Sequence, residues 1–514
     1  MKNKIKTSLF VFIVIGVVVL NITYKNKNEV NKTKRKRQGN LAIIIKDANG
    51  VETNSNDIPI GNYKINEEKT HCENNGKILS YDNTTGKIGF SFIGSDRCYL
   101  YFDVITDTEN PIITNLNING TTVTATLTDN LELSGYGIST SNIVEPSSWT
   151  AISGTSYNLS TTITTEGTYY LWVKDSSDNK IVSAVIDIKI YGWNTILLNS
   201  TLNETTPNFK KIAKTNEGLF KAQDDLGTSY YFRGAVNNNW VKFGKDSSGN
   251  AIYWRIIRIN GDGSIRMIYS GITAPTSSTA IVMTGEGTQI SKGAFNSSYS
   301  DPSYVGYMYT VGQQHGNGTS STIKMVLENW YKTTTLETDS STKALVSQDQ
   351  IFCNDRSVSS GSWSSSTSTS NKFYYATDTR LSTNPSPILT CPTESDKFTS
   401  KKSGIGNKKL EYPIGLITMD EVAMAGGVDT NDNTKFYLVT NEYYWSGSPG
   451  SFNGDYDGAN EFHLYSSGDL GTYHMNSTYG IRPVISLSSS VKLSGSGTWN
   501  DVYTVSWDLF DNTK

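Results

Sequence analysis

Histidine and cysteine are scarce in this chain of 514 residues, which has four of each. So few histidines leave little choice of metal ligands or proton carriers, which argues against a metal-dependent or acid–base enzyme. No cysteine pair has the C-x-x-C spacing, and no cysteine cluster adds histidine at the spacing of a zinc site. We therefore expect no metal ion, no cofactor and no catalytic residue.

An excess of charge of one sign is also lacking, since the formal net charge is −3. A surface this close to neutral does not favour a nucleic-acid partner. The Gly261-Asp262-Gly263 segment lacks the rest of a phosphate-binding loop and a following helix, so we interpret it as a turn. Tyrosine is abundant, with 30 residues. Together with many serines, threonines, asparagines and glycines, this composition is typical of extracellular β-rich modules with long polar loops.

The four cysteines form two pairs that are local in sequence, Cys72 with Cys98 and Cys353 with Cys391. Bonding within each pair would close loops of about 25 to 40 residues, which stabilises a domain by about 3–4 kcal/mol in the loop-entropy model. We predict both disulfides, and disulfides indicate an oxidising exterior. The alternative is four buried free thiols.

A long hydrophobic run occurs at the N-terminus, where residues 9–20 are apolar apart from Gly16 and follow a lysine-rich start. The run is short for a spanning helix but fits a signal sequence, and no small-x-small cleavage site follows it. We favour an uncleaved signal anchor, a single-pass transmembrane helix over residues 1–24, over a cleaved signal peptide. A buried globular helix is the third alternative.

Residues 25–40 form a basic linker. By the positive-inside rule alone this flank would lie in the cytoplasm. The extracellular character of the remaining chain and its paired cysteines lead us to place the C-terminal side outside the cell membrane.

Two small all-β modules are predicted next. Residues 41–106 contain alternating strand patterns and would be stapled by the Cys72–Cys98 disulfide. Residues 110–190 contain short alternating runs separated by turn residues, with the length and spacing of an immunoglobulin-like β-sandwich.

The remaining chain is predicted to hold a polar connector over residues 191–216 and a large domain over 217–514. Residues 253–259 and 264–268 read as a hairpin across the turn sequence of residues 260–263. Apolar side chains recur at helical spacing from Ile323 to Tyr331, and residues 418–421 form a capping box for a second short helix. Two helices among many short strands indicate an α+β domain.

Six segments of this large domain carry a resemblance to a known family: residues 235–243, 253–263, 304–309, 412–418, 443–449 and 479–487. Over residues 219–487 the chain resembles a domain of Firmicutes surface proteins with the C-type-lectin-like fold, in the branch of the formylglycine-generating enzymes. The cysteine pair that binds copper in those enzymes is not visible near the C-terminal end. Residues 169–179 resemble the penultimate strand and turn of a bacterial Ig-like repeat, which implies a stalk module.

Aromatic and short polar side chains crowd the segment between residues 443 and 479, and such groups hold sugars and peptides. In lectin-like folds this late region commonly forms the ligand surface. The candidate ligand-binding residues are Tyr456, Tyr473, His474, Asp455 and Asn476. We interpret Trp445, Phe462, Tyr479 and Arg482 as framework, with Arg482 as a buried structural anchor.

These features together predict an adhesin-like surface protein of a Gram-positive bacterium, anchored in the membrane by its N-terminal helix. Its lectin-like domain would bind a cell-surface carbohydrate or protein ligand without catalysis. The alternatives are an enzyme derived from the formylglycine-generating fold and a structural envelope protein that binds no ligand.

Overall fold

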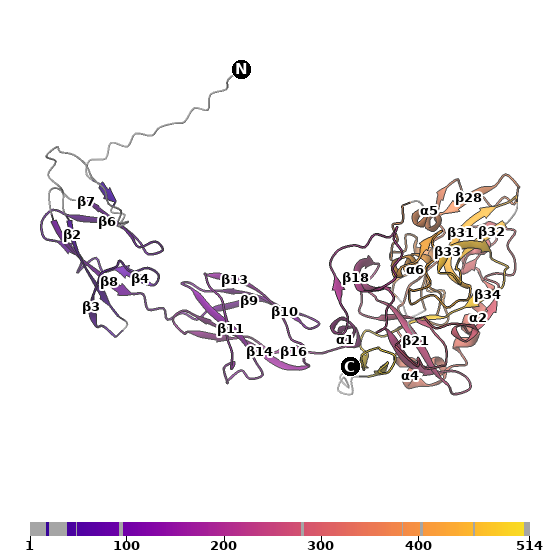
Figure 1. The fold of residues 1–514 in the computed structure, drawn as a ribbon, viewed down its shortest axis with the longest axis horizontal. Helices are drawn as coiled ribbons and strands as arrows, with labels where there is room; N and C mark the ends of the chain where they lie inside the picture. The colour runs from indigo at the N-terminus through magenta and orange to yellow at the C-terminus, as the bar shows by residue number, and fades with distance from the viewer. Residues whose placement is uncertain are drawn as a thin grey trace, which may run out of the picture. The chain divides into compact units, whose positions relative to one another are not determined.

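The chain divides into two compact units in the computed structural model. The structure describes residues 17–19, 39–47, 49–91, 96–278, 282–382, 384–400, 404–455 and 458–507. The first unit holds residues up to 163 together with 167–187, and the second holds residues 164–166 and 188–514. Strands predominate in both units (Figure 1). The predicted multidomain, largely β character is therefore confirmed.

The structure describes only three residues of the segment in which the membrane helix was predicted. Val17–Val19 form a short strand, β1, that pairs antiparallel with strand β7. Among the described residues no helix combines the length and apolar character that crossing a membrane requires. The other residues of the 1–24 segment, and residues 25–38 of the basic linker, lie outside the described part of the chain.

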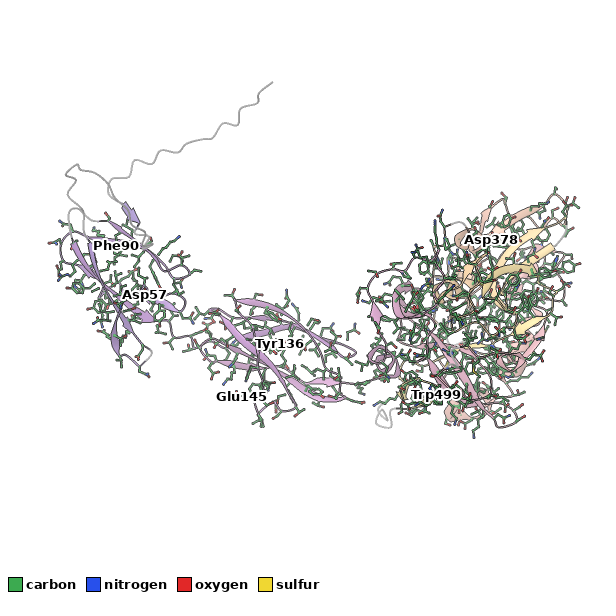
Figure 2. All side chains as sticks on the ribbon, in the orientation of Figure 1. Asp57, Phe90, Tyr136, Glu145, Asp378 and Trp499 are labelled. Atoms are coloured by element: carbon green, nitrogen blue, oxygen red, sulfur yellow. A yellow bond between two sulfur atoms is a disulfide. The ribbon has the colours of Figure 1, made fainter. Side chains whose placement is uncertain are left out.

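The N-terminal part of the first unit consists of two small sheets. A three-stranded sheet orders β1-β7-β6, and a five-stranded sheet orders β3-β2-β8-β4 with β5 also paired to β8. Alternating apolar residues of the strands build one core, which includes Leu100, Phe102 and Phe90 (labelled in Figure 2). The bounds are β2 Gly39–Lys46, β3 Glu52–Ser55, β4 Tyr63–Ile65, β5 His71–Cys72, β6 Lys77–Asp82, β7 Lys87–Ser91 and β8 Asp96–Val104.

Residues 112–188 also form two sheets. One orders β13-β10-β9, and the other orders β12-β11-β14-β15 with β16 paired to β14. Strand β10 buries every second residue, including Val123 and Leu127, as its alternating sequence predicts. The bounds are β9 Ile112–Asn119, β10 Thr122–Thr128, β11 Leu133–Ser139, β12 Thr150–Ala151, β13 Ser156–Thr162, β14 Gly167–Asp175, β15 Lys180–Val182 and β16 Ile186–Ile188.

The second unit contains a nine-stranded sheet ordered β17-β18-β19-β21-β20-β37-β36, with β22 linking β21 to β35. The predicted hairpin is confirmed as antiparallel strands β21 and β22. The bounds are β17 Leu202–Asn203, β18 Asn216–Asp224, β19 Gly227–Gly234, β20 Trp240–Lys245, β21 Ala251–Ile259, β22 Ile265–Tyr269, β35 Val484–Leu487, β36 Lys492–Ser494 and β37 Tyr503–Ser506.

An eight-stranded sheet of the same unit carries the candidate site. It orders β23-β34-β31-β32-β33-β30, and β28 joins β27 to β31. Its bounds are β23 Ser291–Gly293, β27 Val358–Ser360, β28 Lys372–Tyr375, β30 Val428–Asp429, β31 Tyr444–Asn453, β32 Gly458–Leu464, β33 Asp469–His474 and β34 Tyr479–Ile481. Two strand pairs stand apart, β24 Met308–Tyr309 with β25 Thr319–Ser320 and β26 Phe352–Cys353 with β29 Lys397–Phe398.

Short helices cover parts of this unit. Both predicted helices are confirmed, as α2 and as α6, and the capping box formed by Thr418 and Glu421 begins α6. Helix α1 lies in residues 191–216, and its Ile196 belongs to the core of the second unit. The bounds are α1 Gly192–Leu198, α2 Thr322–Tyr331, α3 Thr335–Thr338, α4 Ser340–Ala344, α5 Ala376–Leu381, α6 Met419–Ala425, and the 3-10 helices η1 Glu286–Thr288, η2 Pro302–Val305 and η3 Glu394–Asp396.

Both predicted disulfides are present, and all four cysteines are bonded. Cys72 pairs with Cys98 where β5 meets β8, and Cys353 of β26 pairs with Cys391. Each bond therefore lies within one unit.

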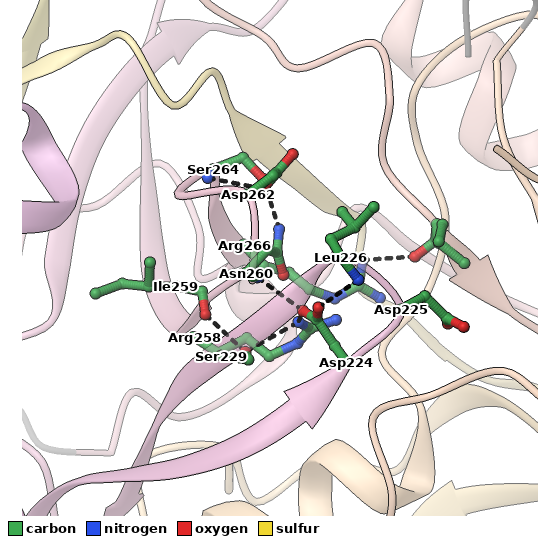
Figure 3. Close-up of polar contacts among 12 residues, drawn as sticks. Asp224, Asp225, Leu226, Ser229, Arg258, Ile259, Asn260, Asp262, Ser264 and Arg266 are labelled. Atoms are coloured by element: carbon green, nitrogen blue, oxygen red, sulfur yellow. Dashed lines mark hydrogen bonds and ion pairs between the residues drawn. The ribbon is translucent and has the colours of Figure 1, made fainter. Parts of the chain in front are cut away.

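A buried ionic network joins strands of the nine-stranded sheet to helix α6 through Glu421. Figure 3 shows Asp224, Arg258 and Arg266 on the strand side of this network. Arg258 Nη1 of β21 donates to Asp224 Oδ2 at 2.6 Å, and its Nε donates to Glu421 Oε1 at 2.9 Å. Arg266 of β22 lies 2.6 Å from the same Glu421 oxygen. Removing one member would leave buried charge uncompensated, so the network fixes how α6 lies against the sheet.

Arg482 connects the two large sheets, because it lies between β34 of one sheet and β35 of the other. Its side chain is buried, and its guanidinium donates to the carbonyls of Tyr269, at 3.1 and 2.9 Å, and of Leu438, at 3.0 Å. The guanidinium also lies over the ring of Tyr444, 4.7 Å from its centroid. The predicted anchor is therefore held by backbone carbonyls and an aromatic face.

Candidate ligand-binding surface

A continuous row of aromatic rings borders the eight-stranded sheet, and we call it the aromatic face: Tyr299, Tyr443, Tyr465, Tyr473, His474 and Tyr479. Tyr443 stacks on Tyr479 with centroids 5.4 Å apart, and Tyr465 contacts Tyr443 at the same distance. Tyr473 joins the row through Tyr479 at 6.2 Å and through His474 at 4.8 Å. His474 in turn contacts Tyr299 at 6.2 Å.

Three members of the aromatic face are well exposed to solvent. The exposed fractions are 39% for Tyr299, 41% for Tyr443 and 46% for Tyr473, while the other three members are half-buried. Rings that contact one another while keeping open faces lose little freedom on binding. Such rings can stack on the apolar faces of a sugar or on the side chains of a peptide.

The register of the strands explains how these rings meet. Tyr444 of β31 pairs with Leu464 of β32, which places the preceding Tyr443 near the following Tyr465. Strand β33 contributes Gly471, and a Cβ built there would lie 2.1 Å from the Tyr465 ring. The glycine therefore makes room for Tyr465 to lie across β33.

His463 lies buried beneath the aromatic face, between Tyr443, Tyr465 and Tyr479. Its ring centroid is 4.6 Å from that of Tyr479 and 4.4 Å from that of Tyr465. Both ring nitrogens are buried without a hydrogen-bond partner. Burial disfavours the imidazolium and lowers the pKa of His463 to about 4. The ring is therefore neutral at pH 7 and supports the surface rings as an apolar group.

Carboxylates flank the Tyr465 end of the aromatic face. Burial raises the pKa of Asp469, which begins β33, and also that of Asp429 in the neighbouring strand β30. Asp378 of α5 has its pKa raised to about 6 by burial first and by the charge of Asp429 second. Carboxylate oxygens accept hydrogen bonds from hydroxyl and amino groups, so this end offers polar contacts beside the rings.

The structure brings together some of the predicted site residues and separates others. Tyr473 and His474 belong to the aromatic face, and the exposed Asn476 follows two residues later. Asp455 lies in the exposed turn after β31, where it forms an ion pair with Lys372 at 3.2 Å. No contact described for Asp455 links it to the aromatic face. Tyr456 lies outside the residues that the structure describes.

The framework predictions hold in part. Trp445, Phe462 and Arg482 are buried, as expected for framework side chains. Tyr479, also predicted as framework, is half-buried and occupies the middle of the aromatic face. Sequence reasoning missed Tyr299 entirely, because it precedes the crowded segment by more than a hundred residues and reaches it only through tertiary folding.

A separate polar cavity lies beside the ionic network, lined in part by Asp224, Arg258, Arg380, Asp420 and Glu421. Arg380 bridges Asp420 and Asp355 in its wall. The cavity leaves about 30 Å³, which is room for one or two water molecules. The charged groups here pair with one another, so we assign this region a structural role.

Neither a known protein family nor a curated protein matches the chain.

Proposed function

We propose that the chain is a cell-surface binding protein whose second unit binds carbohydrate on the aromatic face. The lectin-like fold of residues 219–487, the Ig-like stalk module and the N-terminal membrane anchor belong to the same proposal. Sequence patterns support each of these assignments, and the two disulfides agree with an oxidising exterior.

One observation carries the proposal, namely the unbroken row of partly exposed rings with carboxylates at one end. Aromatic rings that only fill space at a surface have no reason to lie in contact with one another in a row. A carbohydrate ligand, in contrast, uses adjacent ring faces together with fixed polar groups. Tyr443, Tyr473 and Tyr479 offer the ring faces, and Asp469 and Asn476 lie close in sequence to them on β33 and after it.

The sugar chemistry follows from this arrangement. Pyranose rings present C–H groups that pack on tyrosine faces, and their hydroxyls donate to carboxylate and amide oxygens. A cluster of acids would disfavour an anionic glycan through charge repulsion. We therefore propose a neutral or amino-bearing glycan as the ligand.

The alternative enzyme of the formylglycine-generating fold would need a reactive thiol. All four cysteines form disulfides, so that chemistry would first require reduction of Cys353–Cys391. A protein ligand would use the same exposed rings, since tyrosine is enriched at the centres of protein interfaces.

A glycan array probed with the full chain tests the proposal. We expect neutral or amino-bearing glycans to bind, and Tyr473→Ala to lose about 1–3 kcal/mol of binding free energy because an exposed stacking ring is removed. Tyr374→Ala is the matched control, since Tyr374 of β28 is 49% exposed and has no described ring contact with the aromatic face.

Two results would contradict the proposal. Equal glycan binding by the Tyr473 and Tyr374 variants would place the site elsewhere. Absence of any bound glycan would favour a protein ligand or a structural envelope protein.

A further inference from the structure

Three buried aspartates of the first unit converge at one end of the 112–188 sheets. Asp107 precedes β9, Asp129 follows β10 directly, and Asp175 is the last residue of β14. Their exposed fractions are 8%, 8% and 2%. One carboxylate oxygen of each lies within 4.8 Å of an oxygen of the other two. Asp107 and Asp129 are 22 positions apart in the sequence, and Asp129 and Asp175 are 46 apart, yet the three carboxylates form one buried cluster.

Hydrogen bonds from the protein hold one oxygen of each carboxylate in place. Asp129 Oδ1 accepts from the amides of Leu131 at 2.9 Å and Glu132 at 2.7 Å. Asp175 Oδ1 accepts from Ser177 and Asn179, and Asp107 Oδ1 accepts from Glu109 and Asn130. These bonds orient the three carboxylates.

The second oxygens of two of these carboxylates are left without a partner. Asp107 Oδ2 and Asp129 Oδ2 are buried, and neither has a hydrogen-bond donor. Asp175 Oδ2 accepts from the Asn179 side chain at 2.7 Å. Buried carboxylate oxygens are normally paired with donors or cations, so two unpaired ones within one cluster of three carboxylates indicate a missing ligand.

In the described part of the chain, no lysine or arginine forms an ion pair with these three carboxylates. The nearby Lys174 and Lys180 form ion pairs with Asp178 and Glu145 instead. A water molecule could donate to both free oxygens, yet it would leave three negative charges uncompensated. A cation satisfies both the oxygens and the charge.

We propose that Asp107, Asp129 and Asp175 form a binding site for one Ca²⁺ ion. Ca²⁺ binds oxygen ligands at 2.3–2.6 Å, so two ligands on one ion can be up to about 5 Å apart, which accommodates the observed spacing. A hard cation also matches a set of ligands made only of carboxylate oxygens. The ion would tie the segment before β9 to the ends of β10 and β14.

The test is a calorimetric titration of CaCl₂ into the full chain after removal of metals with EDTA. We expect one Ca²⁺ per chain with a dissociation constant on the order of 10⁻⁴–10⁻³ M, the range of extracellular modules. Asp129→Asn should weaken binding at least about tenfold, because the remaining oxygen keeps accepting from the Leu131 and Glu132 amides and an NH2 group, which cannot ligate, replaces the free oxygen. Asp107→Asn should do the same through its own free oxygen.

Asp82→Asn is the matched control. Asp82 Oδ1 also accepts from two following backbone amides, those of Thr84 and Thr85, but it is exposed and lies outside the cluster. This variant should bind Ca²⁺ as the unchanged chain does.

Thermal melting adds a readout that misfolding cannot imitate. Without Ca²⁺ the Asp129→Asn variant should melt at or above the temperature of the unchanged chain, since one repelling charge is gone. With Ca²⁺ added, the melting temperature of this variant should rise less than that of the unchanged chain.

Three outcomes would overturn the proposal. The first is no saturable Ca²⁺ binding by the unchanged chain up to about ten times the expected dissociation constant. The second is equal Ca²⁺ affinity in the Asp129, Asp107 and Asp82 variants. The third is a variant that melts far below the unchanged chain in EDTA, which would assign the aspartates a purely structural role.

Discussion

Single side chains of the second unit show how burial decides between framework and surface roles. Arg482 and Tyr479 both fall in the apolar stretch near the C-terminus, and only Arg482 is fully buried. The Arg-Pro sequence indicated an anchor because arginine is rarely buried without partners. The identity of those partners, two backbone carbonyls and a tyrosine ring, depends on residues up to 213 positions away and has no local signature.

Arg482→Ala should lower the free energy of unfolding by about 3 kcal/mol or more. The change removes charged hydrogen bonds and leaves the Tyr269 carbonyl buried without its donor. Chemical denaturation of the full chain measures the effect. Arg97→Ala, at an exposed position, should leave stability nearly unchanged. If Arg482→Ala instead abolishes glycan binding while the protein melts normally, then Arg482 belongs to the binding site and its assignment as framework is wrong.

His463 should make stability depend on pH. Its folded-state pKa of about 4 lies below the ordinary value of 6.5, so the unfolded state takes up the proton first as pH falls. The contribution of His463 to the free energy of unfolding is fully present above pH 6.5. It decreases between pH 6.5 and pH 4, by up to about 3 kcal/mol.

His463→Phe provides the comparison, because phenylalanine fills similar space and does not titrate. Denaturation at several pH values should show the unchanged chain losing stability relative to this variant between pH 6.5 and pH 4. Parallel curves over that range would show that His463 contributes no proton linkage. Asp378, with its pKa raised to about 6, acts in the opposite direction and is common to both proteins.

At the scale of secondary structure, elements with strong local signals were predicted correctly. The β21–β22 hairpin has a glycine-rich turn, and α6 has the capping box of Thr418 and Glu421. Strand order was not predictable, because β34 pairs parallel to β31 and β35 pairs with β22, over 200 residues earlier. The aromatic face depends on this long-range pairing, so sequence alone located Tyr473 and His474 but not Tyr299.

Gly471→Ala should alter the aromatic face without unfolding the domain. The new methyl group would overlap the Tyr465 ring, and that half-buried ring can swing outward. We expect glycan affinity to change by a few-fold or more while the melting temperature shifts little. Gly287→Ala serves as the control because a Cβ there meets no atom within 4 Å. Unchanged glycan affinity in the Gly471 variant would remove Tyr465 from the binding surface.

At the scale of the whole molecule, the two units hold separate cores and separate disulfides. The cysteine pairing followed from sequence because each pair is local. The acidic cluster of Asp107, Asp129 and Asp175 did not, because only the β-strand ends bring these residues together. Multidomain chains of this kind need not unfold in a single step.

Removing one disulfide should therefore destabilise only the unit that contains it. Replacing Cys72 and Cys98 by serine should lower the stability of the first unit by about 3 kcal/mol, since a loop of 26 residues is no longer closed. Scanning calorimetry should show the transition of the second unit at its original temperature. The Cys353 and Cys391 double variant should give the reverse pattern. A shift of both transitions by either variant would show that the units unfold together.

The local pairing of the cysteines also sets how far the chain can lengthen under mechanical load. When an unfolded chain is stretched from its ends, the residues between two bonded cysteines cannot extend. The 26-residue and 38-residue separations withhold about 90 Å and about 130 Å of contour length. Under the proposed surface-binding function, the stretched chain would thus remain shorter while both bonds are oxidised, and reduction would release the withheld length in two separate steps.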